Sequence, residues 1–318
     1  MNKLIWPAML MLFILVSCNP PTKEQGSQGD LPSSDTYSLE NCETNIADNV
    51  PDFYKNYFTC VSIEMSSDGE SVNISFNGLP PYESWYWQSS HPNYVQFNSQ
   101  GSDYYQNPGN ILEFDTYVSI PLNPEPRSLA INSSLVDGVV GSSSYEYSMG
   151  SVGSALNGVH MFNPLAGPGD VIEDEVYSFD EYSGHPTNTG EYHYHTSSVG
   201  PLEVLGSKGL VTNTTPGSAE IEMYGVMCDG VPVLGCTELD GSRPDGSEWD
   251  AQNGHVHDIL DGDGNVLLSN RYHTHVCYFA DKIDNVSSIG HYFNPEISYY
   301  KSSGGSNDAC KSINNSAN

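Results

Sequence analysis

Three short motifs occur twice in this chain in the same order, and this duplication limits the possible folds more than any other feature. The second copy carries an additional loop, "DILDGDGNVLLSN", between its second and third motifs. A repeated order of motifs indicates two related halves, about 150–200 and 222–280. The matched segments are "GSALNGVHMF" (153–162) with "GVMCDGVPVL" (225–234), "FDEYSGH" (179–185) with "WDAQNGH" (249–255), and "YHYH" (192–195) with "YHTH" (272–275).

The first motif of each half predicts a β-hairpin, because Asn157-Gly158 and Asp229-Gly230 are tight-turn pairs between apolar residues. Glycine, proline and tyrosine number 30, 20 and 21, a composition that disfavours helix interiors. One short helix is expected near residues 46–58. The sequence predicts an all-β fold, mainly antiparallel and sandwich-like, with long loops, two related halves and at most one or two short helices.

The N-terminus is typical of an exported chain. A basic residue and an apolar run lead to "LVSC", which resembles a bacterial lipobox ending at Cys18. We expect residues 1–17 to be a lipoprotein signal peptide, with an ordinary secretory peptide as the alternative. Residues 18–40 would then be a lipidated cysteine and flexible tether, and residues 41–318 the folded domain. Asn19 after the cysteine favours the outer membrane, and no later segment is apolar enough to be a transmembrane helix.

The remaining cysteines and the charge agree with export. Six cysteines outside the signal region predict three disulfides, of which only the Cys42–Cys60 pairing is specified. A formal charge of -30 disfavours nucleic acid as a partner, and leaves a protein or glycan partner undefined.

Pairs of histidines separated by one residue are the main chemical feature. Side chains two apart on a strand point to the same face, so both imidazoles of such a pair can reach one ion. These residues predict a transition-metal site, with zinc or copper favoured, to which strands of both halves contribute. One shared site and two sites related by the repeat both remain open. The predicted ligands are His185, His193, His195, His255, His257, His273 and His275, and the predicted residues that orient them are Asp180 and Asp250.

Other candidates have mainly structural interpretations. His91, His160 and His291 lie outside paired positions and are expected to be mainly structural, with a further metal ligand as the alternative. The acidic loop at Asp261 alternates oxygen ligands like a calcium loop. It lacks the glycine and the glutamate that an EF-hand needs, so we expect a hairpin tip.

The motifs resemble those of the YHYH-domain proteins. The resemblance rests on "ALNGV", "GHP", "YHYH" and "NGHVHD", and it extends over roughly residues 60–300. The final motif differs, because Thr274 stands where the family has a tyrosine. The family implies no settled activity, and its histidines suggest metal binding.

Two classes of function follow from a metal site, and a third does without one. A metalloenzyme, either a hydrolase or an oxidoreductase, would need an open coordination position, with Glu191 or Asp258 as candidate bases. A non-catalytic metal-binding protein would not need one. A surface module that binds polysaccharide or protein would instead use aromatic residues such as Trp85, Tyr86 and Trp87.

Overall fold

The computed structural model describes residues 36–99, 101–167, 170–277 and 294–301. All of these belong to one compact unit, residues 32–318. The predicted signal peptide and Cys18 lie outside the described residues, as does His291. No helix in the described ranges is long and apolar enough to cross a bilayer.

A four-stranded sheet forms the N-terminal part, in the order β1-β2-β3-β4. β2 and β3 are a hairpin whose turn holds Asp68, and the Asp68 carboxylate accepts bonds from the Ser66 hydroxyl and the Glu70 N–H. Inward-facing apolar residues alternate along β4, where Val118 and Ile120 are fully buried. The strands are β1 (Asn45–Ile46), β2 (Ser62–Met65), β3 (Ser71–Phe76) and β4 (Thr116–Pro121).

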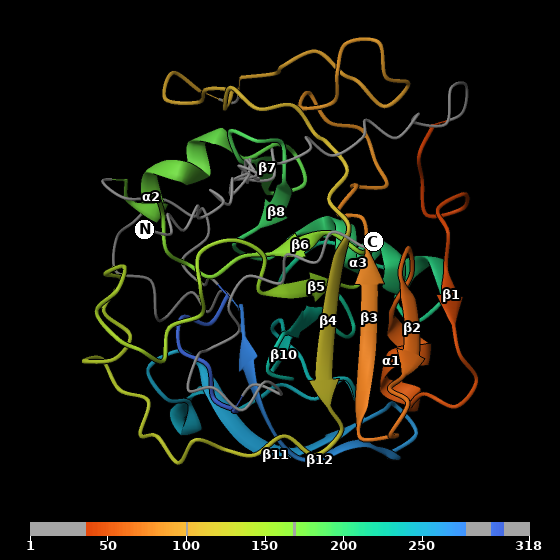
Figure 1. The fold of residues 1–318 in the computed structure, drawn as a ribbon, viewed down its shortest axis with the longest axis vertical. Helices are drawn as coiled ribbons and strands as arrows, with labels where there is room; N and C mark the ends of the chain where they lie inside the picture. Colours follow the sequence, from red (N-terminus) through yellow and green to blue (C-terminus); the bar gives the residue numbers. More distant parts are fainter. Residues whose placement is uncertain (1–35, 100, 168–169, 278–293, 302–318) are drawn as a thin grey trace, which may run out of the picture. The chain divides into compact units, whose positions relative to one another are not determined.

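An eight-stranded sheet carries the duplicated motifs, in the order β11-β12-β10-β9-β5-β6-β8-β7. In Figure 1, β7 and β8 lie at one end of this sheet and β11 and β12 at the other. Its strands are β5 (Gly153–Ala155), β6 (His160–Met161), β7 (Gly184–Pro186), β8 (Tyr192–Tyr194), β9 (Met223–Met227), β10 (Pro232–Leu234), β11 (Gly254–Leu260) and β12 (Val266–His275).

The two halves of this sheet use the same strand pairing. β6 runs parallel to β8, with Met161 opposite Tyr194, and β10 runs parallel to β12, with Val233 opposite Thr274. β5 and β9 meet antiparallel at the centre. Equivalent strands are therefore related by a half-turn about an axis through the β5–β9 pair, normal to the sheet. The repeat seen in the sequence is a repeat of strand order and register.

Helices are short and few. α1 (Asp52–Tyr57) lies inside the predicted helical segment and buries Phe53, Tyr54 and Tyr57. α3 (Val199–Ser207), which the sequence did not predict, begins where the Ser198 side chain accepts a bond from the Gly200 N–H. The others are α2 (Ile172–Glu175) and the 3₁₀ turns η1 (Val176–Ser178) and η2 (Gly246–Glu248).

The predicted fold class is confirmed: the protein is mostly sheet, with short helices and two related halves. Most described strand pairs are antiparallel, while β1–β2, β6–β8 and β10–β12 are parallel. The β6–β8 and β10–β12 pairs are parallel because each half places its YHYH-type strand beside the second strand of its own hairpin.

The predicted disulfide is confirmed, and the aromatic residues 85–87 are buried. The predicted Cys42–Cys60 bond is present, a second bond joins Cys236 and Cys277, and Cys228 is also disulfide-bonded. Of the three aromatic residues 85–87, Trp85 lines a cleft, and each of the three is at most 3 % exposed. Their apolar rings are part of the core.

Candidate metal centres

The seven predicted histidines form two groups on the outermost strand pairs of the large sheet. The first cluster is His185 on β7, His193 on β8 and His195 directly after β8. The second cluster is His255 and His257 on β11 with His273 and His275 on β12, gathered around Glu238. Both groups contain residues that could hold a metal ion, because their ligand atoms lie within 4.8 Å of one another; these residues are His185, His193 and His195 in the first cluster, and Glu238, His255, His257 and His273 in the second.

The clusters are too far apart to share an ion. β6, β5, β9 and β10 lie between β8 and β12. At about 4.8 Å per neighbouring strand, the separation is about 24 Å across the sheet. The hypothesis that both halves converge on one site is therefore wrong, and the duplication instead produces two separate clusters.

In the first cluster, the ring nitrogens that face each other belong to His193 and His195. Their Nε2 atoms are 3.0 Å apart. His193 Nδ1–H donates to the Glu191 backbone carbonyl at 2.9 Å, and His195 Nδ1–H to the Asn163 carbonyl at 2.5 Å. A carbonyl oxygen only accepts, so in each neutral ring the proton is on Nδ1. Two Nε2 lone pairs are thus directed at the same point.

His185 completes this cluster from the neighbouring strand. Its Nδ1 lies 2.6 Å from Ser178 Oγ, which donates in turn to the Glu175 carbonyl. Its ring packs edge-on against Phe179, with centroids 4.8 Å apart. These contacts leave His185 Nε2 to face the other two histidines.

The second cluster repeats this arrangement and adds a carboxylate. His273 Nδ1–H donates to the Arg271 carbonyl at 2.9 Å, and His275 Nδ1–H to the Gly235 carbonyl at 2.7 Å. Gly235 and Asn163 each follow the repeated hairpin directly, so the same backbone position orients the last histidine in both halves.

Glu238 lies at the centre of the second cluster. Its Oε1 is 3.2 to 3.4 Å from Nε2 of all four histidines. A carboxylate oxygen and an imidazole nitrogen without a proton are both acceptors, and they approach this closely only with a proton or cation between them.

Burial favours the neutral form of four cluster histidines, His185, His193, His195 and His273. Desolvation lowers the pKa of His195 to about 4 and that of His273 to about 4. It also holds the pKa values of His185 and His193 well below the usual range, and the neighbouring imidazoles contribute in the same direction.

A turn with the same aspartate hydrogen bonds in both halves positions the first histidine of each cluster. Asp180 Oδ1 accepts the Tyr182 and Gly184 N–H groups, and its own N–H donates to the Gly184 carbonyl. The turn residue Ser183 has φ 58°. In the second half, Asp250 makes the same bonds with Gln252 and Gly254.

The glycine before each histidine is required by a close approach of tyrosine. A Cβ on Gly184 would lie 2.4 Å from Tyr192 Oη, and one on Gly254 would lie 1.9 Å from Tyr272 Oη. This explains the repeated pattern of Asp, three residues, Gly and His. The glycine leaves room for the tyrosine of the paired strand to reach the aspartate.

Asp180 and Asp250 act through these tyrosines. Tyr192 donates its hydroxyl to Asp180 at 2.8 Å, and Tyr272 donates to Asp250 at 2.8 Å. The described hydrogen bonds of both aspartates go to hydroxyls and backbone N–H groups rather than to imidazoles. They therefore fix the strand that carries the histidines, whereas backbone carbonyls orient most of the rings directly.

Sequence reasoning missed the two glutamates. Glu238 contacts the second cluster, and Glu175 Oε2 lies 3.6 Å from His185 Nε2 and 3.8 Å from His195 Nε2. Neither lies in a repeated motif, and the chain has 40 acidic residues. Nothing in their spacing distinguishes them.

The remaining histidines in the described part of the chain have structural surroundings. His91 stacks on Trp87 and accepts the Asn93 N–H through Nδ1. His160 is fully buried, with Nδ1 2.8 Å from Ser151 Oγ. The predicted interpretation therefore fits both residues.

The acidic loop and the two candidate bases make other contacts. Asp261 Oδ1 accepts the N–H groups of Asp263 and Asn265, which is the bonding of a hairpin tip. Asp258 Oδ1 accepts from Ser269 and Asn270. Burial raises the pKa of Glu191 to about 7, and its carboxylate lies 3.6 Å from His160 rather than inside the cluster.

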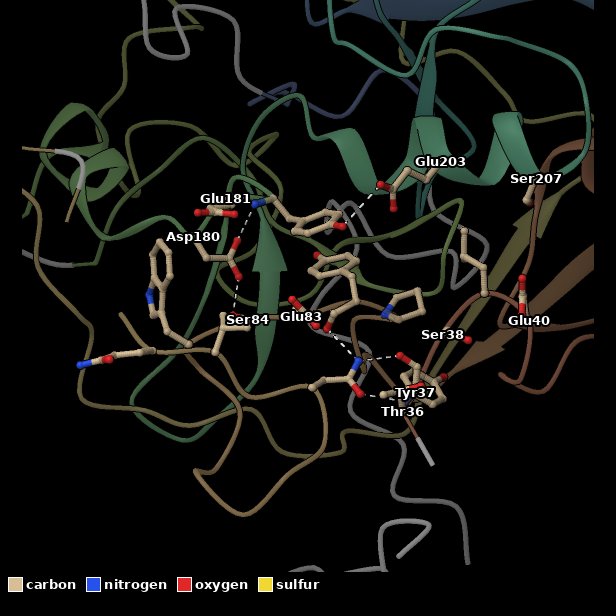
Figure 2. A pocket seen from close by; sticks show the side chains of 18 residues that line it. Thr36, Tyr37, Ser38, Glu40, Glu83, Ser84, Asp180, Glu181, Glu203 and Ser207 are labelled. Carbon is tan, nitrogen blue, oxygen red and sulfur yellow. Dashed lines mark hydrogen bonds between the residues drawn. The ribbon is translucent and has the colours of Figure 1, made fainter. Parts of the chain in front are cut away.

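A cleft of about 820 Å³ lies beside the first half and is lined by none of the seven histidines. Figure 2 shows Asp180 on one side of this cleft, with Glu203 and Glu40 toward the other. Tyr82 and Tyr182, which also line it, stack with centroids 3.5 Å apart. The cleft therefore gives no route to an ion in either cluster.

Comparison with known proteins identifies one family. Residues 119–251 match the model of the YHYH protein family, a shorter stretch than the 60–300 expected from the motifs. The match includes the whole first cluster and Glu238. No curated protein and no solved structure matches the chain. Residues 119–251 of this chain therefore contain a YHYH domain.

Proposed function

We propose that the protein binds two transition-metal ions, one in each histidine cluster. The observation that carries this proposal is the direction of the imidazole lone pairs. His193 and His195 each commit the Nδ1 proton to a backbone carbonyl, and their Nε2 atoms are 3.0 Å apart. Two neutral acceptors at this distance repel one another unless a cation lies between them.

The distances also suit an ion. Donors at about 2.1 Å from one metal lie about 3.0 Å apart at right angles and about 3.4 Å apart in a tetrahedron. The Nε2 pair of His255 and His275 is 3.1 Å apart, and the four contacts of Glu238 are 3.2 to 3.4 Å long. Imidazole-rich donor sets favour zinc or copper.

We further propose that the metal centres belong to an exported, lipid-anchored protein of the outer membrane. Cys18 would carry the lipid, residues 18–40 would form the tether and residues 41–318 the domain. The lipobox-like "LVSC" supports the anchor, and the disulfides are typical of an oxidising compartment.

Metal analysis of the full chain, produced in an oxidising periplasm without a histidine tag, tests the proposal. We expect two equivalents of zinc or copper per chain. His193→Ala/His195→Ala and His273→Ala/His275→Ala should each reduce this to one, because each removes two donors from one cluster.

His91→Gln is the matched control, because His91 lies outside both clusters and should leave two equivalents bound. The state of folding would be verified by circular dichroism. A folded wild-type protein that resists metal loading would contradict the proposal, and would mean that the histidines serve only to pack the sheet edges.

A further inference from the structure

The two clusters share three equivalent histidines but differ in the donors around them. His185, His193 and His195 correspond to His255, His273 and His275 by position in the repeated motifs. The second cluster adds a fourth imidazole from His257. The equivalent residue of the first half is Thr187, whose hydroxyl lies 2.9 Å from that of Thr189 and also accepts the Glu191 N–H.

The carboxylates differ as well. Glu238 Oε1 contacts all four imidazoles of its cluster at 3.2 to 3.4 Å, the separation expected of donors around one ion. Its second oxygen, Oε2, is buried and without a hydrogen-bond partner in the described structure. Glu175 approaches only two imidazoles, at 3.6 and 3.8 Å, and does not belong to the group of ligand atoms within 4.8 Å.

On the basis of the proposed function, we infer that the two ions have different coordination spheres. The second cluster is a closed centre in which Glu238 is a ligand beside His255, His257 and His273, whose ligand atoms form one group within 4.8 Å. His275 lies outside that group but is the fifth donor, because its Nε2 is 3.1 Å from that of His255 and 3.2 Å from Glu238 Oε1. The first cluster is an open centre in which three imidazoles leave a position for water or a small anion. An ion with three protein ligands retains such a position, whereas five donors fill it.

Glu175 faces the open position of the first centre. Its carboxylate is on the side of His185 and His195, beyond the distance of a direct neighbour around the ion. A carboxylate there can accept a hydrogen bond from a bound water molecule. Its side chain is 19 % exposed, whereas His185 and His195 are 3 % exposed, so Glu175 marks the side from which a small ligand enters.

The negative charge available to each ion also supports one closed and one open centre. Glu238 provides a negative charge directly to its ion, which offsets part of the charge of a buried divalent cation. The first centre has neutral imidazoles and a carboxylate at longer range. An anion bound to the first ion would supply the charge that Glu238 supplies in the second.

Cobalt(II) spectroscopy with azide as the probe tests this inference in full-length protein. His273→Ala/His275→Ala leaves only the first centre, and His193→Ala/His195→Ala leaves only the second. We expect one cobalt ion in each variant. The first centre should absorb visible light more strongly, because fewer ligands surround the ion, and azide should shift its spectrum while leaving the second centre unchanged.

The matched control is a variant whose second cluster lacks the two features that distinguish it from the first, the fourth imidazole and the central carboxylate. His257→Thr/Glu238→Gln, in the protein lacking the first centre, should make the second centre respond to azide. Equal responses of the two centres, or a response of the second alone, would overturn the inference while the proposed metal binding stands. Absence of cobalt from both centres would instead contradict the proposed function, and this inference with it.

Discussion

His160 shows what burial does to a histidine outside the two clusters. It is fully buried on β6, its Nε2 has no hydrogen-bond partner in the described structure, and Gly78 packs directly against that atom. Desolvation lowers the pKa of His160 from 6.5 to about 3. The folded protein therefore holds this ring neutral at pH values where the unfolded chain would protonate it.

The pH dependence of stability should reveal this group. Between pH 6.5 and pH 3 the unfolded state binds one more proton at His160, so the free energy of unfolding falls as the pH falls. At about 1.4 kcal/mol per pH unit, the loss between pH 6.5 and pH 4 is roughly 3 kcal/mol. Denaturant unfolding of wild type and His160→Gln at both pH values measures it. Between pH 6.5 and pH 4, the free energy of unfolding should fall by roughly 3 kcal/mol less in the variant than in the wild type. Equal losses in the two proteins would contradict the attribution to His160.

At the scale of elements, one disulfide distinguishes the second half from the first. Cys236 follows β10 and Cys277 follows β12, and these two strands run parallel. The disulfide is close to His275 in the chain on both strands, because His275 is two residues before Cys277 and its Nδ1–H donates to the carbonyl of Gly235, the residue before Cys236. The first half has Pro164 and Ser197 at the corresponding places, so its parallel pair β6–β8 is held without a cross-link.

Removal of this disulfide should affect both stability and the second centre. The bond closes a loop with a sequence separation of 41, so Cys236→Ser/Cys277→Ser should cost about 4 kcal/mol, mainly through the unfolded state. It should also weaken metal binding by the second cluster at least tenfold, because the strands that align His275 can separate.

Cys42→Ser/Cys60→Ser is the control for the removal of the Cys236–Cys277 disulfide. Its loop has a sequence separation of 18, so we expect a loss of about 3 kcal/mol. Metal affinity at the second cluster, measured by competition with a chromophoric chelator, should remain that of the wild type. An equal loss of affinity in both variants would show that general destabilisation, not strand alignment, is the cause.

At the scale of the whole molecule, the eight-stranded sheet connects the two histidine clusters through continuous strand pairing. β5 and β9 join the halves, with Ser154 opposite Val226. Because no break separates the halves along this sheet, we expect them to unfold in one cooperative transition.

Chelation of the metal should lower the stability of this single unit. An ion at a hundred times its dissociation constant stabilises the folded state by about 2.7 kcal/mol per site, so two sites give roughly 5 kcal/mol. The difference in free energy of unfolding between loaded and chelator-treated protein should be about half as large in His193→Ala/His195→Ala. A difference as large as that of the wild type would mean that the first cluster contributes no binding energy.

The sequence alone predicted the local chemistry of the two histidine clusters. The alternation of Tyr and His on a strand places His193 and His195 on one face, because the side-chain period of a strand is two. The aspartate turn and its glycine also repeat visibly at Asp180 and Asp250. The all-β class, the two halves and the Cys42–Cys60 bond follow from composition, motif order and cysteine spacing.

The number of histidine clusters and the carboxylates beside them depended on tertiary structure. The repeat shows that the halves are related, but only strand order places β7–β8 and β11–β12 at opposite ends of one sheet. Glu238 and Glu175 lie outside the repeated motifs, and the path of the chain alone brings them to the imidazoles. Strand periodicity is a local property that the sequence determines, whereas strand order and contacts across long loops depend on how the whole chain packs.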